Sequence, residues 1–346
     1  MRRGIVGIEN IGNTCYIAAV LQCIGHCRNI VSTIFHGVEG LHGRIVSRAL
    51  ADIYAKKWSR ESLESIDPTA LVNALKSRPD SFIDYGVQND AHEFLVELLT
   101  AVESDHVNIV VNESMSVRTG IQGLILGGRE HWGRTVASKS CGLTDAVYGQ
   151  HAFLTQCPVC KHVSQSFDVF VALPFVLNNN TLQAQIDADG CYVETIDGFH
   201  CDKCQNRADS RRECKISRLP KLLVVQVMRF GYGTSKDSSR ITIEEHIDVS
   251  RISLSSQACK YTLVGMVCHS GSSQRGGHYY AVCKYTAKTW VVFDDTKSYS
   301  INLVAVRAED PYLLFYELID LDQRSSNPKT TVSSSVSSVD ASSLDR

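Results

Sequence analysis

Apolar residues recur at helical spacing in the first third of the chain. The segment Cys15–Cys27 has apolar residues on more than one face, which predicts a buried helix. The two polar residues before it are of the kind that cap helix starts. A second helix is predicted over Pro68–Lys76, with Asp67 as its N-cap and proline at its first position. A third is predicted over Asp90–Val102, because its apolar residues fall on one face.

From about Val147 the pattern changes to short segments rich in Val, Phe and Tyr and bounded by Pro, Asn and Gly, which is typical of strands. A mainly helical part up to about residue 105, followed by strands, predicts an α+β fold. The expected strands lie within residues 147–156, 162–177, 219–232, 261–271, 277–286, 289–296 and 311–318.

The two ends of the chain carry separate signals. Near the start, the apolar run is short and is broken by Glu9 and Asn10, so we expect neither a signal peptide nor a membrane span there. No other segment approaches the ~18 uninterrupted apolar residues of a membrane helix. At the other end, Ser325–Arg346 contains nine serines and no aromatic residue, which predicts a disordered tail.

Composition narrows the class of protein. With 44% apolar residues, 21% charged residues and a net charge of −2, the chain is typical of a globular protein and lacks the basic excess of a nucleic-acid binder. The 13 cysteines are unusual. Because no secretory signal is expected and intracellular thiols stay reduced, these cysteines are better explained as metal ligands or nucleophiles than as disulfides.

Two C-x2-C pairs, separated by residues 161–200, have the spacing of metal-binding turns. Each pair places two thiolates on one turn, and two such turns complete a tetrahedral site suited to Zn²⁺. Four protein ligands leave no open position, so we expect a structural metal. A redox dithiol, scattered buried cysteines, or ligation by His162 or His200 are the alternatives. The predicted ligands are Cys157, Cys160, Cys201 and Cys204.

Cys15 is the best candidate for a nucleophile. It follows a turn-prone Gly-Asn-Thr sequence and begins an apolar helix. A helix N-terminus stabilises a thiolate through its dipole and free amide groups. Cys23 and Cys27 lie deeper in the same helix, where a packing role is expected.

A thiol nucleophile needs a general base, for which two histidines compete. His278 follows Gly276 and Gly277, which permit close approach of another chain, and it begins a predicted strand. His269 lies within an apolar strand and fits a core histidine as well as a base. The residues by themselves leave both open.

A third group should hold the imidazole in the correct tautomer. Asp294 and Asp295 end the strand that follows the histidine strand, and neighbouring antiparallel strands would bring them beside His278. A polar turn is the alternative, since Asp-Asp-Thr-Lys is a good turn sequence.

Taken together and in this order, the motifs resemble the ubiquitin-specific protease family over Gly7–Leu318. GIENIGNTCYIAAVLQ is similar to its cysteine box, VQNDAHEFLVELL to its glutamine–aspartate box, and YTLVGMVCHSGSSQRGGHYYAVCKY with WVVFDDTKS to its histidine box. The resemblance implies a papain-like cysteine protease fold with a helical thumb, a β-rich palm and zinc-ribbon fingers. The implied catalytic domain covers residues 1–322, with the thumb at about 1–105, palm and fingers at about 140–320, the zinc ribbon at about 155–206, and the tail at 323–346.

The resemblance also implies roles for individual residues. Cys15 matches the nucleophile, His278 the general base and Asp294 the acid that orients it, while His269 matches a non-catalytic position. Asn10 matches the side chain that donates to the oxyanion. The implied assisting acid is Asp295, and the implied ubiquitin-binding residues are Asp90 and Glu93, which meet a basic tail, and Gly276 and Gly277, which narrow its channel.

The chain departs from the family pattern at a few positions. Ile17, Ala18 and Ala19 stand where the family often has Met-Asn-Ser, and Asn89 and His92 stand where it has glutamines. Ala18 lacks the asparagine side chain that makes a local hydrogen bond in the family, but the catalytic residues are all present.

The implied activity is that of a cysteine-type deubiquitinase, which hydrolyses the (iso)peptide bond after the C-terminal glycine of ubiquitin through a thioester on Cys15. The implied cofactor is one structural Zn²⁺, and the partners are ubiquitin and ubiquitinated proteins, with no nucleic acid or membrane. An intracellular location, cytoplasmic or nuclear, is expected. The alternatives are an inactive ubiquitin-binding relative, a protease of another ubiquitin-like modifier, a general papain-type peptidase and a zinc-ribbon nucleic-acid module.

Overall fold

The computed structural model describes most of the chain. The expected disordered tail and the domain boundary at residue 322 lie outside the described residues. Within the described residues, none of the helices has both the length and the apolar character needed to cross a bilayer. The described residues are 3–27, 30–32, 34, 44–83, 86–106, 120–137, 141–177, 181–188, 192–230, 236–254, 259–273, 276–302, 306 and 310–319.

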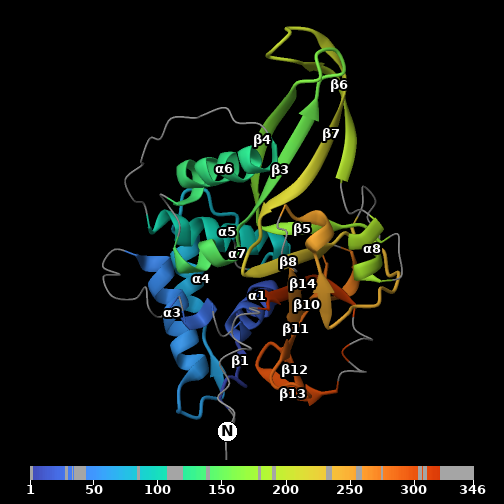
Figure 1. Cartoon of the computed structure of the whole chain (residues 1–346). Coiled ribbons are helices and arrows are strands. Elements are labelled where there is room, and N and C mark those ends of the chain that lie inside the picture. Colours follow the sequence, from blue (N-terminus) through green and yellow to red (C-terminus); the bar gives the residue numbers. More distant parts are fainter. Residues whose placement is uncertain are drawn as a thin grey trace, which may run out of the picture.

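A group of helices forms one side of the body (Figure 1). The central one, α1 (Cys15–His26), is buried along its whole length, as its apolar residues on several faces predict. It packs between α5 (Ala91–Ser104) and strands of the main sheet. Helices α3 (Ile45–Trp58) and α4 (Thr69–Lys76) pack on one another beside it.

The predicted helix starts are confirmed to within a residue, and their caps differ in chemistry. Helix α5 begins after Asp90, whose carboxylate accepts hydrogen bonds from the next amides, as expected of an N-cap. Helix α4 begins at Thr69, one residue later than predicted, although the Asp67 carboxylate still accepts from the Thr69 amide at 2.8 Å. Thr14 precedes α1 without capping it through its side chain.

The main sheet has the strand order β13-β12-β11-β10-β14-β8-β5, with β9 (His246–Asp248) paired to β10. Alternate residues divide between two cores: Ala281 faces the core that contains α1, and Val282 faces the core that contains α8 (Leu182–Ala188). The other strands are β5 (Ala172–Phe175), β8 (Leu222–Val227), β10 (Lys260–Ser273), β11 (Gly276–Lys284), β12 (Trp290–Asp294), β13 (Lys297–Ile301) and β14 (Pro311–Leu318).

A second sheet of four strands projects away from the body, at the top of Figure 1. Helix α6 (Gly120–Trp132) packs against its base, where a Cβ on Gly127 would lie 3.1 Å from the Phe167 ring. The π-helical turn η1 (Gly133–Ala137) and α7 (Gly142–Val147) lead into it. Its strands are β3 (Gly149–Gln156), β4 (Val163–Phe170), β6 (Tyr192–His200) and β7 (Arg207–Arg218).

The N-terminal segment joins the helices to the sheet. Strand β1 (Gly7–Ile8) pairs in parallel with β2 (Ser65–Ile66). The Ile8 amide donates to the carbonyl of Asp295 at 3.0 Å. Gly7 lies so close to this turn that a Cβ would be 2.5 Å from the Asp295 carbonyl oxygen, so only glycine fits. Among the described residues, a 3-10 turn, η2 (Ser250–Ile252), follows β9.

Candidate active site and metal centre

The candidate nucleophile begins the buried helix. Cys15 is the first residue of α1 and only 3% exposed. The chain reaches it through Gly12 and Asn13, whose φ angles of 116° and 54° make a sharp left-handed turn. The thiol therefore lies at a helix N-terminus, among backbone amide groups that have no partner within the helix.

His278 lies between this thiol and a carboxylate. Its Nε2 is 2.6 Å from Asp294 Oδ1, which leaves Nδ1 for the sulfur. Interaction with the Cys15 side chain raises the pKa of His278 to about 9, with Asp294 adding to the rise and burial opposing it. At neutral pH the imidazole is therefore protonated and paired with the thiol and the carboxylate.

The strand register explains how the histidine and the acid meet. Strands β11 and β12 are antiparallel, and Ala281 lies opposite Phe293. The same register puts Asp294 diagonally across from His278 on one face of the sheet, within reach of a long side chain. Asp294 ends β12, as the sequence predicts.

His269, the competing histidine, has a different environment. It is 1% exposed on β10 and packs against the rings of Tyr279 and Phe230 at 4.6 and 5.5 Å. Burial, followed by nearby Lys236, lowers its pKa to about 4. An imidazole with so low a pKa is a weak base, and within the described residues neither ring nitrogen has a hydrogen-bond partner to orient it, so the geometry favours His278.

Asn10 is fixed at both ends of its side-chain amide. Its oxygen accepts from the Gly12 and Thr14 amides at 3.3 and 2.9 Å, and its nitrogen donates to Asp295 Oδ2 at 3.1 Å. An amide nitrogen carries two N–H groups, so one remains for an oxyanion at Cys15. Asp295 adopts a left-handed φ of 52° at this contact.

The acidic residues of the thumb differ from one another. Asp90 is 6% exposed, caps α5 and accepts from the Tyr312 hydroxyl at 2.5 Å. Glu93 is exposed at the surface, but neighbouring atoms partly desolvate its carboxylate. This desolvation, together with nearby Asp90, raises its pKa. Both line a groove of about 710 Å³ that also includes Asn13 and the segment 86–90.

A further residue closes this groove against the histidine strand. Gln88 donates to the Gly277 carbonyl at 3.0 Å and accepts from the Gly277 amide at 3.1 Å. We did not predict this role, since the partners are 189 residues apart. The only signal was the position of Gln88 in the VQND motif.

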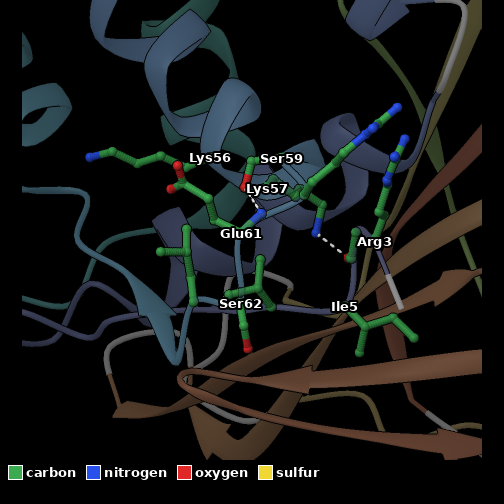
Figure 2. A pocket seen from close by; sticks show the side chains of 11 residues that line it. Arg3, Ile5, Lys56, Lys57, Ser59, Glu61 and Ser62 are labelled. Carbon is green, nitrogen blue, oxygen red and sulfur yellow. Dashed lines mark hydrogen bonds between the residues drawn. The ribbon is translucent and has the colours of Figure 1, made fainter. Parts of the chain in front are cut away.

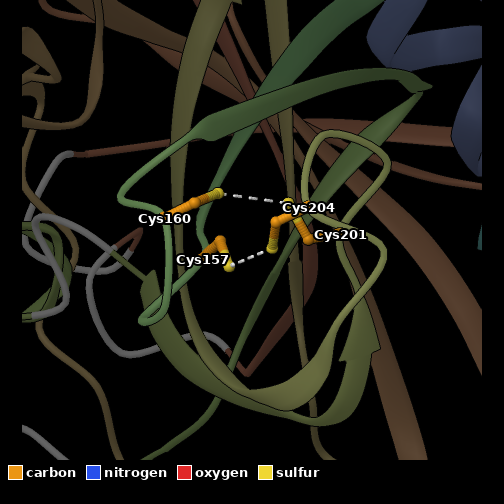
Figure 3. Close-up of side chains that lie close together, drawn as sticks. All are labelled: Cys157, Cys160, Cys201 and Cys204. Carbon is orange, nitrogen blue, oxygen red and sulfur yellow. Dashed lines mark hydrogen bonds between the residues drawn. The ribbon is translucent and has the colours of Figure 1, made fainter.

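The four predicted metal ligands come together at the end of the projecting sheet (Figure 3). Two like turns carry them: Lys161 and Gln205, each just after a C-x2-C pair, have φ angles of 60° and 61°. The sulfurs of Cys157 and Cys204 are 3.7 Å apart, as are those of Cys160 and Cys201. Four thiolates about 2.3 Å from a tetrahedral ion would be about 3.8 Å from one another, so the residues fit Zn²⁺.

The fold thus brings the helix-borne thiol of Cys15, the strand-borne His278 and the carboxylate of Asp294 together in space. Residues 6–316 match the family model described as ubiquitin carboxyl-terminal hydrolase. The chain therefore belongs to this family, and the resemblance drawn from its motifs is confirmed.

Curated relatives bear the family's name. Human ubiquitin carboxyl-terminal hydrolase 2 is 26% identical over 91% of this chain and 55% of its own length. Probable ubiquitin carboxyl-terminal hydrolase 16 of Schizosaccharomyces pombe is 26% identical over 90% of this chain and 66% of its own length. The chain thus spans little more than half of the human relative.

Solved structures share the fold. The SAGA DUB module containing Ubp8, bound to monoubiquitin, gives a TM-score of 0.74 at 23% identity, covering 92% of this chain and 70% of that chain. The module bound to ubiquitin aldehyde gives 0.69 at 23% identity, with the same coverage. The predicted α+β fold is confirmed.

Proposed function

We propose that this protein is a deubiquitinating cysteine protease, which cleaves the (iso)peptide bond after the C-terminal glycine of ubiquitin. The observation that carries the proposal is the pairing of His278 with Cys15 on one side and Asp294, at 2.6 Å, on the other. Membership of the ubiquitin carboxyl-terminal hydrolase family supplies the substrate class.

The proposed reaction begins with attack of the Cys15 thiolate on the carbonyl carbon of the last glycine. The Asn10 amide donates to the oxyanion that forms. His278, held by Asp294, gives its proton to the departing amine, and a thioester is left on Cys15. Water, deprotonated by His278, then hydrolyses the thioester and frees the glycine carboxylate.

We propose that the groove beside Gly276 and Gly277 takes the ubiquitin tail. The bond between Gln88 and Gly277 limits its width and supports selection of glycines. Exposed Glu93 would meet a basic residue of the tail directly, whereas buried Asp90 would act through the helix start that it caps.

We propose that the cysteine cluster holds one structural Zn²⁺ through Cys157, Cys160, Cys201 and Cys204. Their spacing matches a tetrahedral ion, and the ion would join the tips of two hairpins without entering the reaction. The free thiols of the described cysteines support a reducing compartment, so we place the protein in the cytoplasm or nucleus.

The proposal predicts that purified protein releases the fluorophore from ubiquitin carrying a C-terminal fluorogenic amide, and that Cys15→Ala abolishes release. Without the thiolate no thioester forms, so activity should fall by at least about 10³-fold. The control is retained ubiquitin binding by Cys15→Ala. Binding without turnover by the wild type would favour an inactive ubiquitin-binding relative, and turnover of only another modifier's amide would favour that modifier.

A further inference from the structure

A buried lysine lies beside α1, where it bonds to Gln22. Lys57, near the end of α3, is only 2% exposed. Its ammonium donates to the Gly4 carbonyl at 2.9 Å and to the side-chain oxygen of Gln22, and Figure 2 shows the bond to Gly4 at the edge of a pocket. Both partners are uncharged.

These bonds join the N-terminal segment to the helices α3 and α1. Gln22, on α1, also donates to the Val6 carbonyl at 2.9 Å, while the Gly4 amide donates back to the Lys57 carbonyl at 3.1 Å. The Lys57 ammonium lies 4.6 Å from the centre of the Phe293 ring on β12. Residues 4–6 are therefore held from α3 and α1, and the ammonium that holds them also lies over β12.

The held segment continues directly into the active site. Residues 4–6 lead into β1, where the Ile8 amide bonds to the Asp295 carbonyl. Two residues later, the side-chain amide of Asn10 donates to the Asp295 carboxylate. Phe293, under the ammonium, immediately precedes Asp294. Lys57 thus contacts two segments: the N-terminal segment that leads to Asn10, through Gly4, and the strand that ends at Asp294, through Phe293.

Stability alone does not account for a cation at this position. Burial lowers the pKa of the Lys57 amine to about 7, which means that the fold disfavours its charged form. An apolar side chain of similar length would fill the space without this penalty. Gly25 leaves room for both Tyr54 and Lys57, since a Cβ there would lie 2.8 Å from the Tyr54 ring and 3.1 Å from Lys57 Cδ.

We propose that Lys57 is a positioning residue for the hydrolysis: it holds residues 4–6 so that Asn10 and Asp295 stay aligned with the Cys15 thiolate. The inference rests on the proposed function, and it adds a residue that never touches the substrate.

The test compares Lys57→Met with Lys56→Met, which alters the neighbouring exposed lysine on the same helix end. Because displacement of a catalytic group by about 1 Å costs about 10²-fold, a partial loosening predicts that Lys57→Met lowers kcat on the fluorogenic ubiquitin amide about tenfold. KM should stay within about twofold, since the groove is intact, and kcat is measured well below the melting temperature of the variant, because the oxygens of Gly4 and Gln22 lose their donor. Lys56→Met should match the wild type.

A double-mutant cycle shows whether Lys57 acts through Asn10. If it does, Lys57→Met should cost less than about twofold in the Asn10→Ala background. The proposal would be overturned if the losses in kcat from Lys57→Met and Asn10→Ala multiply in the double variant. It would equally be overturned if Lys57→Met leaves kcat unchanged, or lowers kcat only in step with the melting temperature. If Lys57→Met does not fold, Gln22→Met removes the same connection from the α1 side and should give the same result.

A second readout separates this inference from the proposed function. Hydrogen exchange at the Ile8 amide reports on the β1 contact whether or not the protein turns over ubiquitin. It should be faster in Lys57→Met than in the wild type, while α1 amides are unchanged. An inactive wild type would contradict the proposed function alone, whereas unchanged exchange at Ile8 would contradict the role of Lys57.

Discussion

At the scale of single residues, neighbours decide which histidine and which acid can act. His278 and His269 are nine positions apart on adjacent strands, yet the pKa of one is raised to about 9 and that of the other is lowered to about 4. Contact with a thiol and a carboxylate causes the rise, and burial among aromatic rings causes the fall. The residue types along the chain do not show these surroundings, which is why they left both candidates open until the family resemblance favoured His278.

The ion pair between His278 and Asp294 predicts a distinct dependence of activity on pH. Asp294 is one cause of the raised pKa of His278, so kcat/KM should fall above about pH 9, where the imidazolium needed to protonate the amine is lost. Asp294→Asn keeps an oxygen acceptor but removes the charge, so this upper limb should move to lower pH. Asp294→Ala removes both and should reduce kcat/KM by about 10²-fold or more.

The pH profiles of the three proteins on the fluorogenic ubiquitin amide provide the measurement. An upper limb that stays in place in Asp294→Asn would show that Asp294 does not act on His278 through its charge.

At the scale of secondary-structure elements, periodicity predicted many of the buried and half-buried elements but missed the half-buried helix α3. Helices α1, α4 and α5 and strands β3, β8, β10, β11, β12 and β14 occur where they were expected. Strands β6 and β7 of the four-stranded sheet were not predicted; β7 (RADSRRECKISR), for example, carries mainly polar residues and has little apolar alternation. Strand β1 has two residues, too few for any periodic signal, and it exists through its pairing with β2 and the Asp295 turn.

The docking of β1 predicts an effect of a single methyl group. In Gly7→Ala the new Cβ would overlap the carbonyl oxygens of Asp295 and Thr296, so β1 must move away from the turn and carry Asn10 with it. We expect kcat to fall at least about tenfold and stability to fall by about 1–3 kcal/mol.

Gly133→Ala is the matched control, since a Cβ there meets nothing within 4 Å. Steady-state kinetics and urea unfolding measure both effects. Wild-type activity in Gly7→Ala would mean that β1 does not position Asn10.

At the scale of the whole molecule, a compact body carries a narrow ribbon with little core of its own. Phe170 and Ile216, which belong to the second core, lie near the base of the ribbon, while Val159 and Val193 farther along it are exposed. Such a ribbon needs a cross-link such as a structural metal, because it buries too little apolar surface to offset the conformational entropy lost when it becomes ordered. The four-cysteine cluster lies in this ribbon, where a metal would supply the cross-link.

Loss of the metal should therefore unfold the ribbon first. Cys160→Ser is expected to reduce the zinc content from about one per chain to near zero and to open the ribbon to proteolysis. Turnover should weaken mainly through a higher KM, since the catalytic residues belong to the body. Cys214→Ser, on β7 but outside the cluster, is the matched control and should retain its zinc.

Elemental analysis and limited proteolysis of the three proteins make this comparison. A wild type that is folded and free of zinc would contradict the proposed metal site.

Local patterns in the sequence predicted a nucleophile at a helix start and two pairs of metal-binding cysteines, and they offered candidates for the base and the acid, among which the family resemblance favoured His278 and Asp294. These signals involve residues only a few positions apart, so the sequence by itself could supply them. The bonds from Asn10 to Asp295, from Gln88 to Gly277 and from Lys57 to Gly4 join residues 285, 189 and 53 positions apart. Only the tertiary structure decided these contacts, because they depend on how whole elements pack and not on any pattern along the chain.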